Sequence, residues 1–215
     1  MLLKTLSLTL LIVAFSLTGL GCTGVAGSGT AATDKRTVGA FSEVEVHGVI
    51  ELELTLGKTH SVELSGDDNL LPLLDAVVDG DRLIIKGTKS MSPKLPLIAK
   101  VTAPNVSLAR GSGATKLRIE GVDNDELKIE LSGAGKVEAK GKTKALALQV
   151  SGAGDIDAKA LSVESVKVSV SGAGQIDLAE PNELDVDISG AGEVRYSGDP
   201  KITKDISGAG ELIKR

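Results

Sequence analysis

The chain has 215 residues, with 29 acidic against 24 basic side chains, a net charge of −5 and only 1% aromatic residues. An acidic chain with so few aromatic rings lacks both the positive surface and the stacking platforms that nucleic-acid binding needs, so no nucleic-acid partner is expected. A single cysteine excludes an internal disulfide bond.

Residues 1–21 have the features of an export signal peptide. Lys4 supplies a positive charge ahead of the apolar run Leu6–Leu20. This run is too short to be a spanning helix, which needs about 20 apolar residues, and its length is that of a cleavable signal segment.

The only cysteine, Cys22, directly follows this leader. The junction resembles the lipobox of bacterial lipoproteins, although Gly19 stands where that motif prefers leucine. The resemblance implies lipid attachment at Cys22 and therefore a membrane partner. Because Thr23 is not aspartate, it further implies an outer-membrane address, on the periplasmic or the surface face. The alternative is an ordinary cleaved leader that leaves a free thiol.

Residues 22–36 are mainly small and polar, a composition typical of flexible linkers. They are predicted to form a tether between the lipidated cysteine and one folded domain over residues 37–215.

The first part of this domain, residues 37–105, alternates apolar and polar residues as half-buried strands do. Gly80-Asp81 predicts the turn of a hairpin, and Asp67–Leu71 a helical turn or loop. We expect this part to cover one end of the repeats that follow and to continue their sheets. The strands are predicted at Phe41–Val46, Val49–Leu56, Ser61–Leu64, Ala76–Val78, Arg82–Lys86 and Leu97–Thr102.

Residues 106–215 carry a repeated sequence, Ser-Gly-Ala-Gly. A degenerate copy, Ser112-Gly113-Ala114-Thr115, precedes five full ones, and successive serines are 20, 19, 20, 18 and 18 residues apart. A fixed period of this length is typical of stacked-repeat proteins. The full copies begin at Ser132, Ser151, Ser171, Ser189 and Ser207.

Aligning the copies on the serine reveals apolar columns with a period of two, which predicts two short strands per repeat and no helix. The fold class predicted is all-β, a right-handed parallel β-helix, or solenoid, with rungs about 4.8 Å apart. The glycines are expected at a tight corner, with the alanine pointing inward and the serines in a column. A flexible glycine-rich linker is the alternative, and the apolar alternation argues against it. The column five residues after the serine holds Leu117, Val137, Ile156, Ile176, Val194 and Leu212.

The last repeat departs from this pattern. Lys204 and Lys214 occupy columns that are otherwise apolar, and Tyr196 enlarges a column of smaller side chains. Charged residues at inward positions discourage further stacking, so we expect a frayed terminal cap.

No residue pattern predicts catalysis, and no cofactor or metal ligand is assigned. His47 and His60 lack the spacing of a metal pair, and no nucleophile elbow is present. Aspartates that recur on neighbouring rungs are the best remaining candidates, because stacked carboxylates could bind calcium or act as acid and base on a polysaccharide. One of their columns also contains Arg118, Glu138 and Arg195, as a solvated face would. The stacked aspartates are Asp157 with Asp177 and Asp187 with Asp205.

Three stretches together resemble the head GIN domain family, a family of putative auto-transporter adhesin heads. They are Phe41–Gly48, Gly80–Ile85 and Val194–Pro200, in combination with the repeated Ser-Gly-Ala-Gly, and the resemblance covers residues 38–213. It implies a β-helical fold on an exported, lipid-anchored protein and supplies no catalytic residues.

The function expected from these observations is that of a non-catalytic cell-envelope lipoprotein. A rigid rod would display ladders of polar side chains to an envelope, surface or host macromolecule, as an adhesin does. The alternatives are a carbohydrate-active enzyme or binder and a calcium-stabilised module.

Overall fold

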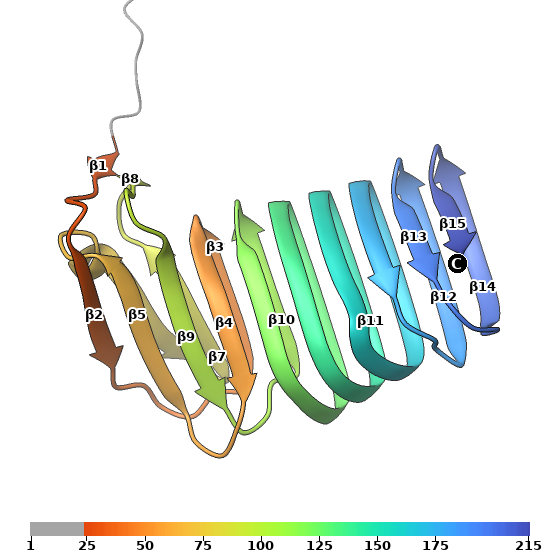
Figure 1. The fold of residues 1–215 in the computed structure, drawn as a ribbon, viewed down its shortest axis with the longest axis horizontal. Helices are drawn as coiled ribbons and strands as arrows, with labels where there is room; N and C mark the ends of the chain where they lie inside the picture. Colours follow the sequence, from red (N-terminus) through yellow and green to blue (C-terminus); the bar gives the residue numbers. More distant parts are fainter. Residues whose placement is uncertain (1–23) are drawn as a thin grey trace, which may run out of the picture.

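The computed structural model describes residues 24–215, so the predicted leader 1–21 and Cys22 lie outside the described residues. Within that range the chain forms a 13-stranded sheet and a two-stranded sheet, with one 3-10 turn, η1 (Leu71–Leu73) (Figure 1). The N-terminal part holds β1 (Val25–Ala26), β2 (Ala31–Arg36), β3 (Glu43–Gly48), β4 (Ile50–Leu56), β5 (Ser61–Asp67), β6 (Leu74–Asp79), β7 (Arg82–Gly87), β8 (Met91–Ser92) and β9 (Leu97–Ala103). The repeats hold β10 (Leu108–Gly113), β11 (Lys116–Leu178), β12 (Glu183–Gly190), β13 (Glu193–Tyr196), β14 (Lys201–Gly208) and β15 (Glu211–Lys214).

The repeats lie on one another in parallel register. β10 pairs with β11 so that Ser112 lies beside Ser132, and β12 pairs with β14 so that Ser189 lies beside Ser207. β11 is assigned as a single strand because its pairing continues through the bends, and Figure 1 draws it as a ribbon that folds back several times. The predicted alignment of equivalent positions is confirmed wherever β10, β12 and β14 pair.

The N-terminal part continues both sides of these ladders. β3 pairs in parallel with β10, and β4 pairs in parallel with β11. Beyond them, β7 pairs in parallel with β3, and β9 pairs in parallel with β4. The outer strands are antiparallel: β6 pairs with β7, and β5 pairs with both β9 and β2. The sheet is therefore mixed, and the predicted hairpin forms between β6 and β7.

The core is a continuous aliphatic column between the two sides of each rung. Five of the six predicted members of one column, from Leu117 to Val194, are at most 1% exposed, while Leu212 on the last rung is half-buried. Aliphatic branched side chains dominate because two strands of one rung face each other across a narrow interior that leaves little room for rings. Burial of this column is the main favourable term in the stability of the stack.

The alanine of each repeat does not point inward, contrary to the prediction. Ala134, Ala153 and Ala173 are exposed, whereas the second glycine faces the core. The first glycine explains this orientation, since it adopts a positive φ, such as +128° at Gly152, which turns the next side chain outward. A Cβ on the second glycine would meet inward side chains, as at Gly154, where Leu131 Cδ2 would be 2.4 Å away.

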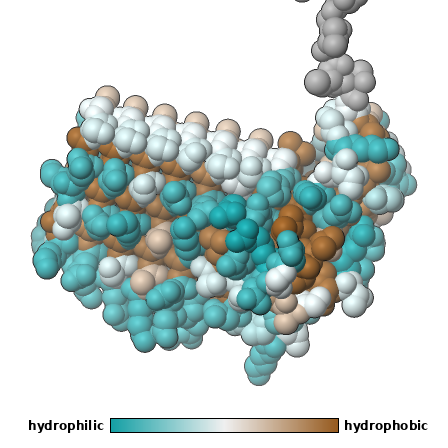
Figure 2. All heavy atoms as spheres, turned by 180° about the vertical axis from the view of Figure 1, so that it is seen from behind, coloured by the Kyte–Doolittle hydropathy of each residue, from teal (hydrophilic) through white to brown (hydrophobic). Residues whose placement is uncertain are grey.

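The exposed Ser-Gly-Ala corners form a surface that we call the ridge. Its members are Ser112–Ala114, Ser132–Ala134, Ser151–Ala153, Ser171–Ala173, Ser189–Ala191 and Ser207–Ala209. In Figure 2 the ridge is the pale row of spheres along one long edge of the molecule.

Residues 24–36 are not a flexible tether, contrary to the prediction. β1 pairs in parallel with β8, and β2 pairs antiparallel with all of β5. Composition alone could not reveal this, because the groups that hold the segment lie about 40 residues further along the chain, in Asp67–Asn69.

The last rung places its two lysines at the register positions that the sequence predicted, while Ile206 and Leu212 pack against the core. Lys204 lies beside Val186 in the inward column and Lys214 beside Tyr196, yet both lysines are exposed. That this rung frays remains a prediction.

Candidate functional site

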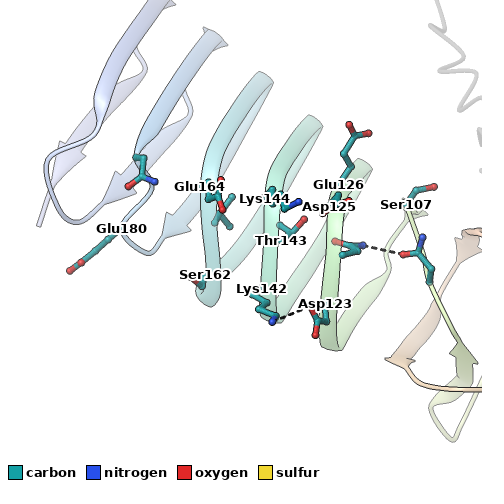
Figure 3. Close-up of a pocket in the computed structure, with 14 residues that line it drawn as sticks. Ser107, Asp123, Asp125, Glu126, Lys142, Thr143, Lys144, Ser162, Glu164 and Glu180 are labelled. Carbon is teal, nitrogen blue, oxygen red and sulfur yellow. Dashed lines mark hydrogen bonds and ion pairs between the residues drawn. The ribbon is translucent and has the colours of Figure 1, made fainter.

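A polar groove runs across the bends opposite the ridge. Its volume is about 1000 Å³, and Figure 3 shows that its side chains come from successive rungs of the stack. It arises because the connection between the two strands of each repeat varies in sequence, whereas the Ser-Gly corner does not. The side chains that line it include Asn105, Ser107, Asp123–Glu126, Lys142–Lys144, Ser162–Glu164, Glu180 and Asn182.

The groove is acidic. Five carboxylates line it against two ammonium groups, Lys142 and Lys144, which gives a net charge of −3. Each lysine pairs with an aspartate of the previous rung, Lys142 with Asp123 at 3.3 Å and Lys144 with Asp125 at 2.7 Å. The hydrogen bond from Asp125 raises the pKa of Lys144.

The remaining groove carboxylates are free to meet a ligand. Glu126, Glu164 and Glu180 take part in no ion pair with another residue of 24–215. Amides and hydroxyls between them supply further hydrogen-bonding groups. Asn124 Nδ2 donates to Val106 O at 3.0 Å, while its Oδ1 is buried without a hydrogen-bond partner in the described chain. The groove can therefore offer several acceptors to an extended polar ligand.

Charged side chains form ladders on the flanks of the stack. On the β3–β10 side, Arg110 lies between Glu45, at 3.3 Å, and Glu130, at 2.5 Å. Burial opposes ionisation of Glu130, yet its bonds to Lys128 and Arg110 prevail and lower its pKa, while the Glu130 carboxylate raises the pKa of Arg110. Opposite charges on neighbouring rungs thus stabilise the observed register of this flank.

The stacked aspartates are brought together as predicted, but Asp157 and Asp177 form ion pairs with basic side chains of the stack. Lys159 lies 3.0 Å from Asp157 and 3.7 Å from Asp177, and Arg195 lies 3.1 Å from Asp177. Burial of Asp157 opposes its ionisation, but the bonds from Lys159 lower its pKa. Asp187 and Asp205 are register partners on β12 and β14.

The two histidines are engaged separately. His60 Nε2 lies 2.9 Å from Phe41 O, with the two rings edge to face at a centroid distance of 4.8 Å. His47 Nε2 lies 2.8 Å from a Glu45 oxygen. Within residues 24–215, no group of three or more His, Cys, Asp or Glu side chains is placed to hold a metal ion.

The aspartate columns could be predicted from the sequence, whereas the groove was not predicted. Its residues fall in the variable connections, where no column recurs. The signal available in the sequence was the excess of polar residues at these connections, such as Asp123-Asn-Asp-Glu126. No helix in the described part of the chain is long and apolar enough to cross a bilayer.

Comparisons with solved structures show the same fold in other bacterial proteins. A putative adhesin from Bacteroides fragilis superimposes with a TM-score of 0.71 at 23% identity, covering 89% of this chain and 99% of that one. A putative lipid binding protein from Parabacteroides distasonis gives a TM-score of 0.56 at 19% identity, covering 90% and 100%. A putative adhesin from Parabacteroides merdae gives 0.53 at 19% identity, covering 89% and 99%.

A comparison with curated proteins found no match. A family model described as "putative auto-transporter adhesin, head GIN domain" matches residues 40–200, which is most of the chain. The resemblance inferred from the sequence is therefore confirmed, and the chain belongs to the head GIN domain family of putative auto-transporter adhesins.

Proposed function

We propose that this protein is a non-catalytic scaffold of the cell envelope, anchored by a lipid on Cys22, that presents polar side chains to a macromolecular partner in the manner of an adhesin. The single observation that carries the proposal is the parallel register of the repeats, in which equivalent residues of β10, β11, β12 and β14 lie side by side. A partner that lies along the stack would meet a similar chemical group at every rung, about 4.8 Å apart.

The proposal includes the winding of the chain as a right-handed β-solenoid. Each rung returns to a strand that is parallel to the one before it, and parallel crossovers are right-handed in nearly all proteins. Such a rod is stiff because each rung is hydrogen-bonded to both neighbours. Stiffness suits display, since little conformational entropy is lost when a partner binds.

The groove is the region of the rod that we assign to partner contact. It combines unpaired carboxylates with amides, whereas the flanks use most of their charges in ion pairs with one another. The family description is that of a surface protein, which supports an envelope location.

Binding arrays test this proposal. The labelled full chain is applied to immobilised glycans and to envelope and matrix proteins, next to a groove variant, Glu126→Gln/Glu164→Gln/Glu180→Gln. The matched control, Glu51→Gln/Asp155→Gln/Glu211→Gln, removes three carboxylates from outside the groove. Binding that the groove variant loses and the control keeps supports the proposal, and binding that both variants keep contradicts the assignment of the groove. Degradation of the protein by protease added to intact cells would identify the surface rather than the periplasmic face.

A carbohydrate-active role is the second candidate, because five carboxylates lie in one groove. Two carboxyl groups that flank a glycosidic bond are the usual apparatus of glycoside hydrolysis. Release of reducing ends from acidic polysaccharides by the wild type, and not by the groove variant, would favour this role over display.

A further inference from the structure

The N-terminal segment is held to the body by a buried carboxylate. Asp67 is 0% exposed, and its Oδ1 accepts a hydrogen bond from the backbone N–H of Gly29 at 2.6 Å. Its Oδ2 accepts from the backbone N–H groups of Lys94, at 2.9 Å, and Leu95, at 3.0 Å. Burial opposes ionisation, but these three bonds prevail and lower the pKa of Asp67. One side chain thus joins the N-terminal segment to the loop before β9.

The two residues after Asp67 complete a clamp. Ser28 Oγ donates to Asp68 Oδ1 at 2.5 Å, and Ser28 N donates to Asn69 Oδ1 at 2.8 Å. Asn69 Nδ2 donates in turn to Ala26 O at 2.8 Å. We call Ala26–Thr30 together with Asp67–Asn69 the clamp. Its packing is close, because a Cβ at Gly27 would lie 2.3 Å from Asp67 Oδ2.

The clamp leaves almost no slack between the predicted anchor and the body. Val25 N donates to Ser90 O at 2.8 Å, so the body begins at β1. Three peptide steps separate Cys22 from Val25, where β1 begins, and a chain extends by at most about 3.6 Å per residue. A lipid on Cys22 would therefore hold β1 and its partner β8, together called the β1/β8 corner, within about 11 Å of its attachment point.

The β1/β8 corner suits contact with lipid headgroups. Val25 is 36% exposed, and Lys89 and Lys94 are exposed beside β8. Lysines near a membrane surface are attracted to anionic headgroups. Figure 1 shows β1 and β8 on the side of the molecule where β3 and β10 end, which is the side of the ridge.

Charge favours the same orientation. The ridge consists of serine, glycine and alanine, so it can approach headgroups without removing charges from water. The groove lies at the opposite bends and carries a net charge of −3, which anionic headgroups repel.

We propose, resting on the anchored scaffold described above, that the clamp seats the β1/β8 corner on the lipid surface, with the ridge side toward the bilayer and the groove away from it. The head then stands directly on its membrane instead of at the end of a tether, and its groove is the surface open to partners.

Spin labels on the lipidated full chain test this arrangement. The protein is reconstituted in vesicles of phosphatidylethanolamine and phosphatidylglycerol, with one introduced cysteine at the corner (Ser90→Cys), the ridge (Ala153→Cys) or the groove (Ser162→Cys). Because Cys22 is the only native cysteine and is blocked by lipid, each label is unique. The measurement is the rate of collision with a water-soluble nickel chelate and with oxygen. We expect chelate collisions to be several-fold slower at residue 90 than at residue 162, with residue 153 between them.

A variant with a flexible Gly-Ser insertion after Thr23 is the matched control. It keeps the clamp and the fold but restores slack, so it should make the three sites equally accessible to the chelate. Equal accessibility of the three sites in the protein without the insertion would overturn the inference. Slow collisions at residue 90 that persist in detergent without lipid would also overturn it, since they would indicate a protein contact.

Flotation with the vesicles separates the two proposals. A chain that fails to float contradicts anchoring at Cys22, whereas a chain that floats with equal accessibilities contradicts only the orientation.

Discussion

The first glycine of each repeat sets how closely the rungs approach, and Gly172→Ala tests this directly. Gly172 has a φ of +141°, and a Cβ there would lie 2.2 Å from Gly152 O and 2.9 Å from Gly152 N. The strained backbone is expected to cost about 1–3 kcal/mol. Overlap with the backbone of the previous rung, which cannot rotate away as a side chain could, adds about 1–3 kcal/mol. The total predicted loss is thus about 2–6 kcal/mol in the free energy of unfolding.

Two other glycines separate these contributions. Gly80→Ala, in the β6–β7 turn, has a φ of +60° and nothing within 4 Å of the added Cβ, so it should show conformational strain alone, about 1–2 kcal/mol. Gly39→Ala has neither a positive φ nor a neighbour and should be close to neutral. The assay is urea unfolding followed by circular dichroism. If Gly172→Ala destabilised the protein no more than Gly80→Ala, close stacking of the glycine corners would be refuted.

Three further predictions follow from the core, the last rung and the clamp. Ile156→Ala, in the buried column, should lower the free energy of unfolding by about 2–5 kcal/mol. The control Val77→Ala, at a side chain that is 57% exposed, should change it by less than about 0.5 kcal/mol. Equal effects of the two substitutions in urea unfolding would contradict the assigned core. Lys204→Val extends the apolar column over Val186, so hydrogen exchange of the amides of β14 should slow; unchanged or faster exchange would show that the lysine does not limit the last rung. Asp67→Asn should destabilise the protein at neutral pH, and the difference from wild type should shrink in acid. The sign follows from the lowered pKa, because the ionised carboxylate stabilises the fold fully above its ordinary value of 3.8 and this contribution is lost as the pH falls through the lower folded value. A difference in melting temperature that stayed constant from neutral pH to acid would argue against a structural role for the charge.

The repeat architecture could be predicted because its signal is local and recurs. Every rung carries the same alternation of side chains, so a wrong assignment of inward residues in one repeat is corrected by the others. Columns such as Ile156 with Ile176 can therefore be found by aligning the repeats. The hairpin at Gly80 and the break between β3 and β4 at Gly48 could be predicted equally well, since both depend on a glycine with a positive φ.

The clamp and the groove could not be predicted, for different physical reasons. The clamp depends on hydrogen bonds between Ser28 and residues 40 or 41 positions later, and small polar residues give the same composition whether they are clamped or free. The groove depends on which way the variable connections turn. The prediction that the alanine points inward was wrong because the sequence does not reveal which of the two glycines makes the bend. The bend lies at the first glycine, so the second glycine faces the core and the alanine faces solvent.

The most direct test of the account measures distances along the serine column. Spin labels are placed at Ser112 and, in separate samples, at Ser171, Ser189 or Ser207, in a chain with Cys22→Ser, and the distances are obtained by pulsed electron paramagnetic resonance. These pairs span three, four and five rungs, so stacked rungs predict separations of about 14, 19 and 24 Å, rising by about 4.8 Å for each added repeat. Distances that rise by a clearly different step, or distributions without a single maximum, would contradict the claim that the repeats lie directly on one another.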